Sequence, residues 1–108
     1  MDRPPGGDAL PTFLVERYWP GIDLATLREL LPRLDAAASA MTAEGTRIEH
    51  VGSILMPVDE VVFSLFAAGD EALVRELNVR AELPVDRIAE AIALMASPVA
   101  DPRGGSRS

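Results

Sequence analysis

The chain contains one histidine, His50, and this side chain is the first candidate for chemistry. Imidazole is the side chain that most readily exchanges a proton near neutral pH, so His50 is the natural candidate for a catalytic general base. Imidazole is also a common metal ligand, which makes His50 the candidate metal-binding residue. A lone histidine beside apolar residues is equally compatible with an interior side chain whose hydrogen bonds are satisfied. These three interpretations of His50 remain open.

A second candidate group lies in the stretch FLVERYWPG at residues 13–21, which holds the only tyrosine and the only tryptophan of the chain. The alternation of this stretch predicts a strand, with Glu16 and Tyr18 on one face and Arg17 and Trp19 on the other. Glu16 and Tyr18 either line a ligand pocket, with the tyrosine hydroxyl fixing the orientation of the ligand, or Tyr18 is a buried ring whose hydroxyl has a hydrogen-bond partner. Trp19 is either a further ligand contact or a core side chain.

Arg17 is the unusual member of this group because its face of the strand is otherwise apolar. A guanidinium in such a place must be paired or lie at the rim. We expect an ion pair with a carboxylate such as Glu49 or Glu90. The alternative is a clamp for the carboxylate of a ligand.

Several reaction classes are excluded by composition. The chain has no cysteine and no lysine, which removes thiolate and Schiff-base chemistry. Ser39, Ser53 and Ser64 have no neighbouring His–Asp arrangement in the sequence, and a triad that forms only in the folded chain stays open. The formal net charge of −7 disfavours nucleic acid and anionic membranes as partners. The use of arginine for every basic side chain, with abundant alanine, is typical of a high-GC bacterial genome.

The candidate residues must be positioned by a single small domain of α+β class. At 108 residues the chain suits one domain, and it has neither a signal peptide nor an 18-residue apolar run, so we expect a soluble cytoplasmic protein. Composition predicts flexible tails at 1–11 and 97–108, flanking a folded domain at 12–96. Periodicity predicts strands at 12–19, 47–56 and 61–67, and helices between Asp23 and Gly45 and between Asp70 and Pro84. Pro32 is expected to kink the first helix without dividing it.

The segment at residues 85–95, VDRIAEAIALM, fits either a helix or a strand. Alanine and glutamate favour a helix. A strand would cover the otherwise free edge of the first strand, and on this ground we predict a strand over 87–94. The resulting order, β-α-β-β-α-β, is the ferredoxin-like arrangement, with both helices on one face of an antiparallel sheet.

The second and third predicted strands carry apolar side chains on both faces. In a sheet with one solvent-exposed face, each strand should alternate between apolar and polar residues. A second copy of the chain is the economical way to cover the other face, which predicts a homodimeric α+β barrel. Within the second strand, Ile48, His50, Gly52, Ile54 and Met56 are expected to share one face.

With this topology, the stretches FLVERYWPG, MPVDEVVF and VDRIAEAI resemble a family of small bacterial ferredoxin-like proteins grouped as a domain of unknown function. The characterised relative of that family is described as a nickel-binding protein of soil bacteria. The resemblance covers roughly residues 12–95. It implies a dimeric α+β barrel, a strand at 87–94 and nickel as a possible cofactor. His50 would then be the imidazole ligand, combined with Glu16, Glu49 or Asp59, or with a second copy of itself.

Three functions are compatible with these observations. The first is a protein that binds a small molecule or a metal ion within a dimeric barrel. The second is a cofactor-independent monooxygenase or isomerase, with His50 as the base and Tyr18 or Arg17 stabilising negative charge. The third is a structural or interaction module without a ligand.

Overall fold

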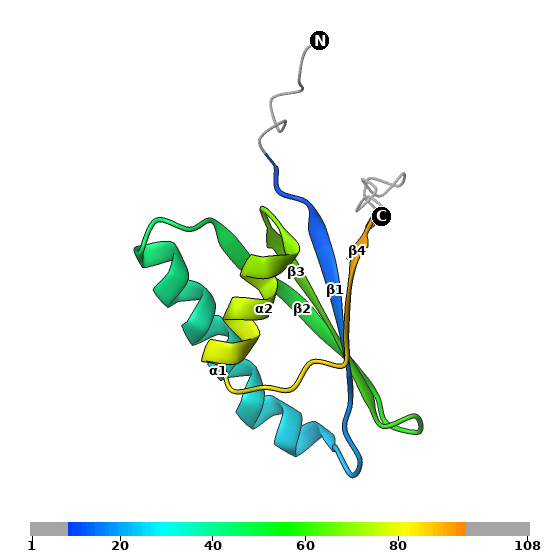
Figure 1. The fold of residues 1–108 in the computed structure, drawn as a ribbon. Helices are drawn as coiled ribbons and strands as arrows, with labels where there is room; N and C mark the ends of the chain where they lie inside the picture. The colour runs from blue at the N-terminus through cyan, green and yellow to red at the C-terminus, as the bar shows by residue number, and fades with distance from the viewer. Residues whose placement is uncertain (1–8, 95–108) are drawn as a thin grey trace, which may run out of the picture.

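The computed structural model describes residues 9–94, which form an α+β fold with a four-stranded antiparallel sheet and two helices. The elements are β1 (Thr12–Tyr18), α1 (Leu24–Ala43), β2 (Ile48–Met56), β3 (Val61–Ala68), α2 (Glu71–Arg80) and β4 (Arg87–Ala91). The sheet order is β2-β3-β1-β4, and both helices lie on one face of the sheet (Figure 1). This arrangement is compatible with a ferredoxin-like fold. Apart from residues 9–11, the expected tails lie outside the described residues.

Helix α1 begins and ends where the sequence predicts. The Asp23 carboxylate caps it by accepting a hydrogen bond from the backbone N–H of Thr26 at 2.8 Å. The helix is a single element of 20 residues with Pro32 inside it, at an exposed position. Gly45 follows with a φ of +100°, a left-handed conformation that glycine adopts without steric cost. The buried face of α1 consists of Leu27, Leu34, Ala37, Ala38 and Met41.

Helix α2 is capped by Asp70, whose carboxylate accepts from the backbone N–H of Leu73 at 3.0 Å. Its end precedes Pro84 by four residues, because a Schellman motif closes it first. Leu83 N–H donates to Asn78 C=O and Glu82 N–H donates to Val79 C=O, each at 3.0 Å. Glu82 adopts a φ of 59° in this motif, where glycine is the usual residue.

The predicted strand near the C-terminus is confirmed over Arg87–Ala91, and β4 pairs antiparallel with β1. Topology therefore outweighs helix propensity in this segment. The core lies between the sheet and the helices. Its fully buried members include Val15, Leu34, Met41, Phe66, Val74 and Leu77. Among residues 9–94, neither helix is both long and apolar enough to span a membrane.

The β2–β3 hairpin differs from the prediction in one respect. A β-bulge between His50 and Gly52 shifts the register, so that His50 pairs with Phe66 and Gly52 with Leu65. The extra residue reverses the alternation along β2. Ile48 and His50 face the helices, whereas Gly52, Ile54 and Met56 face the opposite side. The expectation that all five share one face is therefore wrong.

Candidate functional site

The four candidate residues at 16–19 lie on alternating sides of the sheet, as the period-two pattern of β1 predicted. Glu16 and Tyr18 lie on the side of the sheet away from the helices, where Tyr18 is 56% exposed. Trp19 follows the strand and is half-buried against both hydrophobic clusters of the core. Arg17 faces the helices and is only 2% exposed. The structure therefore separates the four residues into two on the outer face and two toward the interior.

Arg17 is held without the expected ion pair to Glu49 or Glu90. Its Nη1 donates to the backbone carbonyl of Pro84 at 2.8 Å, and its Nη2 donates to Ser64 Oγ at 3.3 Å. Burial lowers the pKa of Arg17 to about 10, and the nearby Asp86 carboxylate acts in the opposite direction. Glu49 is unsuitable as a partner because its register with Ala67 places it on the other side of the sheet.

A chain of side-chain hydrogen bonds leads from Arg17 to the surface, and we call it the polar relay. From Ser64 Oγ it continues to Ser53 Oγ at 2.7 Å and then to His50 Nε2 at 2.9 Å. It ends with His50 Nδ1 and Asp35 Oδ1, 3.0 Å apart. The relay joins side chains of β1, β3, β2 and α1. Sequence reasoning identified two of its members, Arg17 and His50.

The two ends of the polar relay have opposite hydrogen-bonding roles, and one tautomer of His50 is consistent with both. A guanidinium only donates and an ionised carboxylate only accepts. In this arrangement His50 is neutral and carries its hydrogen on Nδ1, which donates to Asp35. At the other end, Arg17 donates to Ser64. The Ser64 hydroxyl then donates to Ser53, and the Ser53 hydroxyl donates to His50 Nε2. Every member then has a partner, and the Ser53 hydroxyl hydrogen points at an imidazole lone pair.

His50 is mostly enclosed at its place in the relay. Its side chain is 7% exposed. The centroids of the His50 and Phe66 rings are 5.3 Å apart, and the ring planes are inclined by 39°.

The β-bulge in β2 places His50 and Ser53 on the same side of the sheet, since residues three apart in a regular strand face opposite sides. Gly52 within the strand was the sequence signal for this bulge. No comparable signal connected Asp35 to His50.

The side chains present do not fit a nickel site within one chain. Nickel favours imidazole nitrogen together with further donors. Both ring nitrogens of His50 already take part in hydrogen bonds, to Asp35 and Ser53. Within residues 9–94 there is no group of three or more His, Cys, Asp or Glu side chains that could hold a metal ion.

The sheet surface away from the helices, which we call the open face, is mainly apolar. Its large apolar side chains are Leu14, Ile54, Met56, Val61, Phe63 and Leu65, brought together by the registers of β1, β2 and β3. At one end of this face, Val61 lies between Tyr18 and Met56. Glu16 and Arg87 are neighbours on β1 and β4, with an Oε1–Nη1 distance of 3.6 Å. The open face thus combines an apolar surface with one ion pair and one phenol.

A shallow groove of about 470 Å³ lies elsewhere, between the two helices. Its floor consists of alanines, and Arg33 and Arg80 stand at its sides. Arg33 donates to the carbonyl oxygens of Ala81 and Glu82, each at 2.9 Å. These bonds use the Arg33 guanidinium to secure the end of α2.

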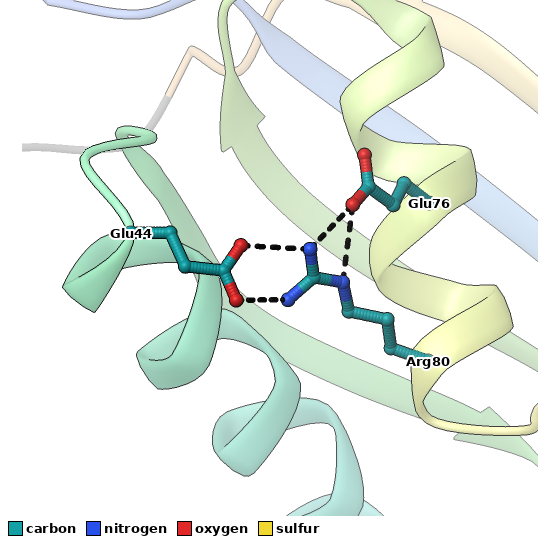
Figure 2. Close-up of polar contacts among 3 residues, drawn as sticks. All are labelled: Glu44, Glu76 and Arg80. Carbon is teal, nitrogen blue, oxygen red and sulfur yellow. Dashed lines mark hydrogen bonds and ion pairs between the residues drawn. The ribbon is translucent and has the colours of Figure 1, made fainter.

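Arg80 is likewise occupied by protein groups. Figure 2 shows its guanidinium between two carboxylates, with Glu44 just beyond α1 and Glu76 one turn earlier on α2. Its two terminal nitrogens bind both oxygens of Glu44 at 2.8 and 2.9 Å, and Nη2 also contacts Glu76 at 2.6 Å. These bonds raise the pKa of Arg80 above its ordinary value. The groove therefore offers no cation that lacks a partner.

Comparison of the chain with models of protein families, with curated proteins and with solved structures finds no match.

Proposed function

We propose that the protein is a small-molecule-binding homodimer in which the open faces of two copies pack together and enclose the ligand. The observation that carries this proposal is the exposure of large side chains on the open face. Tyr18, Ile54 and Met56 are 56%, 53% and 40% exposed in the single chain. Apolar side chains gathered on one surface are typical of an interaction site.

The size of the open face suits a partner of similar shape. Strands about 4.8 Å apart, with a rise of ~3.3 Å per residue, make a four-stranded face of roughly 19 by 23 Å. This is roughly 400 Å² in projection, within the range of the largest apolar patches on monomeric proteins, which are often functional. Two twisted sheets pack face to face in many proteins, and a two-fold axis lets one patch serve both subunits.

Charge also favours a second copy at this surface. The chain carries a net charge of −7, so two copies repel each other over most of their surfaces. Toward the β4 edge of the open face, the negative charge of Glu16 is balanced by Arg87 at 3.6 Å. Contact through the open face therefore brings together apolar side chains and a neutralised pair.

The chemistry of the open face indicates the class of ligand. Phe63, Leu14 and Leu65 offer apolar contacts, whereas the Tyr18 hydroxyl and the Glu16–Arg87 pair offer hydrogen bonds. A small organic molecule with an apolar body and one polar group fits this combination. No metal is included in the proposal, because residues 9–94 do not supply a ligand set. His50 faces the helices, so it would not act on a ligand held at the open face.

Native mass spectrometry of untagged protein, purified without chelators, tests this proposal. We expect a dimer with additional non-covalent mass. Ile54→Glu should give a monomer that has lost this mass, because it places a carboxylate within the apolar interface. Val79→Glu is the matched control, since Val79 is an exposed apolar residue on α2. A monomeric wild-type protein at micromolar concentration would overturn the dimer, and a dimer without added mass would overturn the ligand.

A further inference from the structure

We infer that Ser53 is an activated nucleophile for acyl transfer, with His50 as its general base and Asp35 as the group that orients the imidazole. This site lies between α1 and β2, on the opposite side of the sheet from the open face. It is independent of the proposed dimer. The substrate class is a small ester or a similarly activated acyl compound.

The distances meet the requirements of such a site. A nucleophile and its base must lie within hydrogen-bond reach, and a third group must orient the base. Ser53 Oγ lies 2.9 Å from His50 Nε2, and His50 Nδ1 lies 3.0 Å from Asp35 Oδ1. The serine and the carboxylate thus occupy the two different ring nitrogens. This is the arrangement of a Ser–His–Asp triad, which recurs on unrelated folds.

The polar relay accommodates the direction of proton transfer that this reaction needs, with neutral His50 in the Nδ1–H tautomer. Arg17 can only donate to Ser64, so the Ser64 hydroxyl hydrogen is free to point toward Ser53 Oγ, 2.7 Å away. The Ser53 hydrogen is then directed at His50 Nε2, as proton abstraction requires. The hydrogen bond from Ser64 also favours negative charge on Ser53 Oγ as its proton leaves. Ser64 is fully buried, so its hydrogen bond is not shared with solvent.

The β-bulge in β2 lies next to the proposed nucleophile and base. The bulge at His50–Gly52 brings a base and a nucleophile three residues apart to one side of β2. Bulges of this kind are frequent beside active sites, where they redirect a side chain.

Ser53 lies on a strand at the edge of the sheet. It is partly exposed, and β2 is an edge strand. An edge strand presents backbone N–H groups that have no neighbouring strand. Backbone N–H groups are among the donors that stabilise the oxyanion of a tetrahedral intermediate.

The reaction balances without a cofactor. Ser53 Oγ attacks the carbonyl carbon of the ester as its proton passes to His50 Nε2, giving a tetrahedral intermediate. The bond from carbon to the leaving oxygen then breaks, and that oxygen takes the proton from His50. Water attacks the resulting acyl-serine, with His50 again accepting a proton and returning it to Ser53. The products are a carboxylic acid and an alcohol.

The first experiment treats the folded full chain with a fluorophosphonate, which transfers its phosphonyl group to an activated serine and releases fluoride. We expect one covalent adduct per chain, located at Ser53 by peptide mass spectrometry. The rate should fall at least tenfold in His50→Gln. Ser39→Ala should leave it unchanged, because Ser39 is an exposed serine on α1. A folded wild-type protein without an adduct at Ser53 would overturn the inference, as would an unchanged rate in folded His50→Gln.

A second experiment does not depend on whether His50→Gln folds. The chain has no cysteine, so Ser53→Cys and Ser39→Cys each introduce a single thiol. Thiolate is the form that iodoacetamide alkylates, and a nearby imidazole promotes it. Ser53 is less exposed than Ser39, so access alone would make its variant react more slowly. We expect Ser53→Cys to react at least tenfold faster at pH 6, and an equal or slower rate would overturn the inference.

Discussion

The Glu60 carboxylate accepts a hydrogen bond from the backbone N–H of Gly21 at 2.8 Å, which ties the β2–β3 turn to the loop after β1. The backbone carbonyl of Glu60 also accepts from the N–H of Trp19 at 2.7 Å. Glu60 adopts a φ of 57°, a left-handed conformation that is costly for a residue with a side chain. These two bonds connect the turn to the segment that carries the only tryptophan.

We predict that Glu60→Ala lowers the free energy of unfolding by about 1 kcal/mol, because it removes the acceptor for the Gly21 N–H. In a domain of this size that loss corresponds to a decrease in melting temperature of about 4–8 °C. Thermal unfolding followed by circular dichroism would measure it. Asp59→Ala, at the exposed neighbouring position of the same turn, should stay within about 0.5 kcal/mol of wild type. Equal effects of the two changes would show that the bond contributes nothing.

Arg17→Lys should be destabilising although it preserves the charge. The Arg17 guanidinium reaches Pro84 C=O and Ser64 Oγ with two different nitrogens. A lysine ammonium has no such fork, so one buried acceptor would be left without its donor. We expect a loss of roughly 1–3 kcal/mol in urea unfolding.

Arg28→Lys is the matched control for this change, because Arg28 is exposed on α1. It should leave the urea midpoint unchanged. A midpoint for Arg17→Lys that equals wild type would contradict the structural role assigned to the two hydrogen bonds.

The ion cluster at Arg80 should make stability depend on pH in the acid range. The hydrogen bond from Arg80 holds the pKa of the Glu44 carboxyl below its ordinary value of 4.5. A carboxyl group with a lowered pKa in the folded state stabilises the fold above its unfolded pKa. This contribution is lost as the pH falls through the folded value. Glu44→Gln should therefore lower the melting temperature at pH 7, with the difference shrinking below pH 4.5.

Melting temperatures of wild type and Glu44→Gln, measured from pH 7 to pH 2.5, would test this expectation. The difference at pH 7 should also decrease in 1 M salt, since the groups involved are exposed. Glu29→Gln removes the same charge at an exposed position within α1 and should lack this pH profile. A constant difference across the pH range would exclude ionisation of Glu44 as its cause.

The sequence by itself determined the elements of this fold, because their signals are local. Asp23 and Asp70 marked the beginnings of the two helices, and Gly45 marked the end of the first. Strand β4 required one further step, the need to pair the edge of β1. The apolar open face was also predictable, since β3 carries large apolar side chains on both of its sides.

Only the tertiary structure decided which polar groups meet. Arg17 and the Pro84 carbonyl are 67 residues apart, and His50 and Asp35 are 15 residues apart on different elements. Alternation along β2 would have placed His50 and Ser53 on opposite faces, and one extra residue in the bulge reversed that outcome. Hydrogen bonds of this kind depend on packing between distant segments, whereas helix caps and strand periodicity depend on neighbours in the chain. The positions of the elements were therefore readable from the sequence, and the polar relay was not.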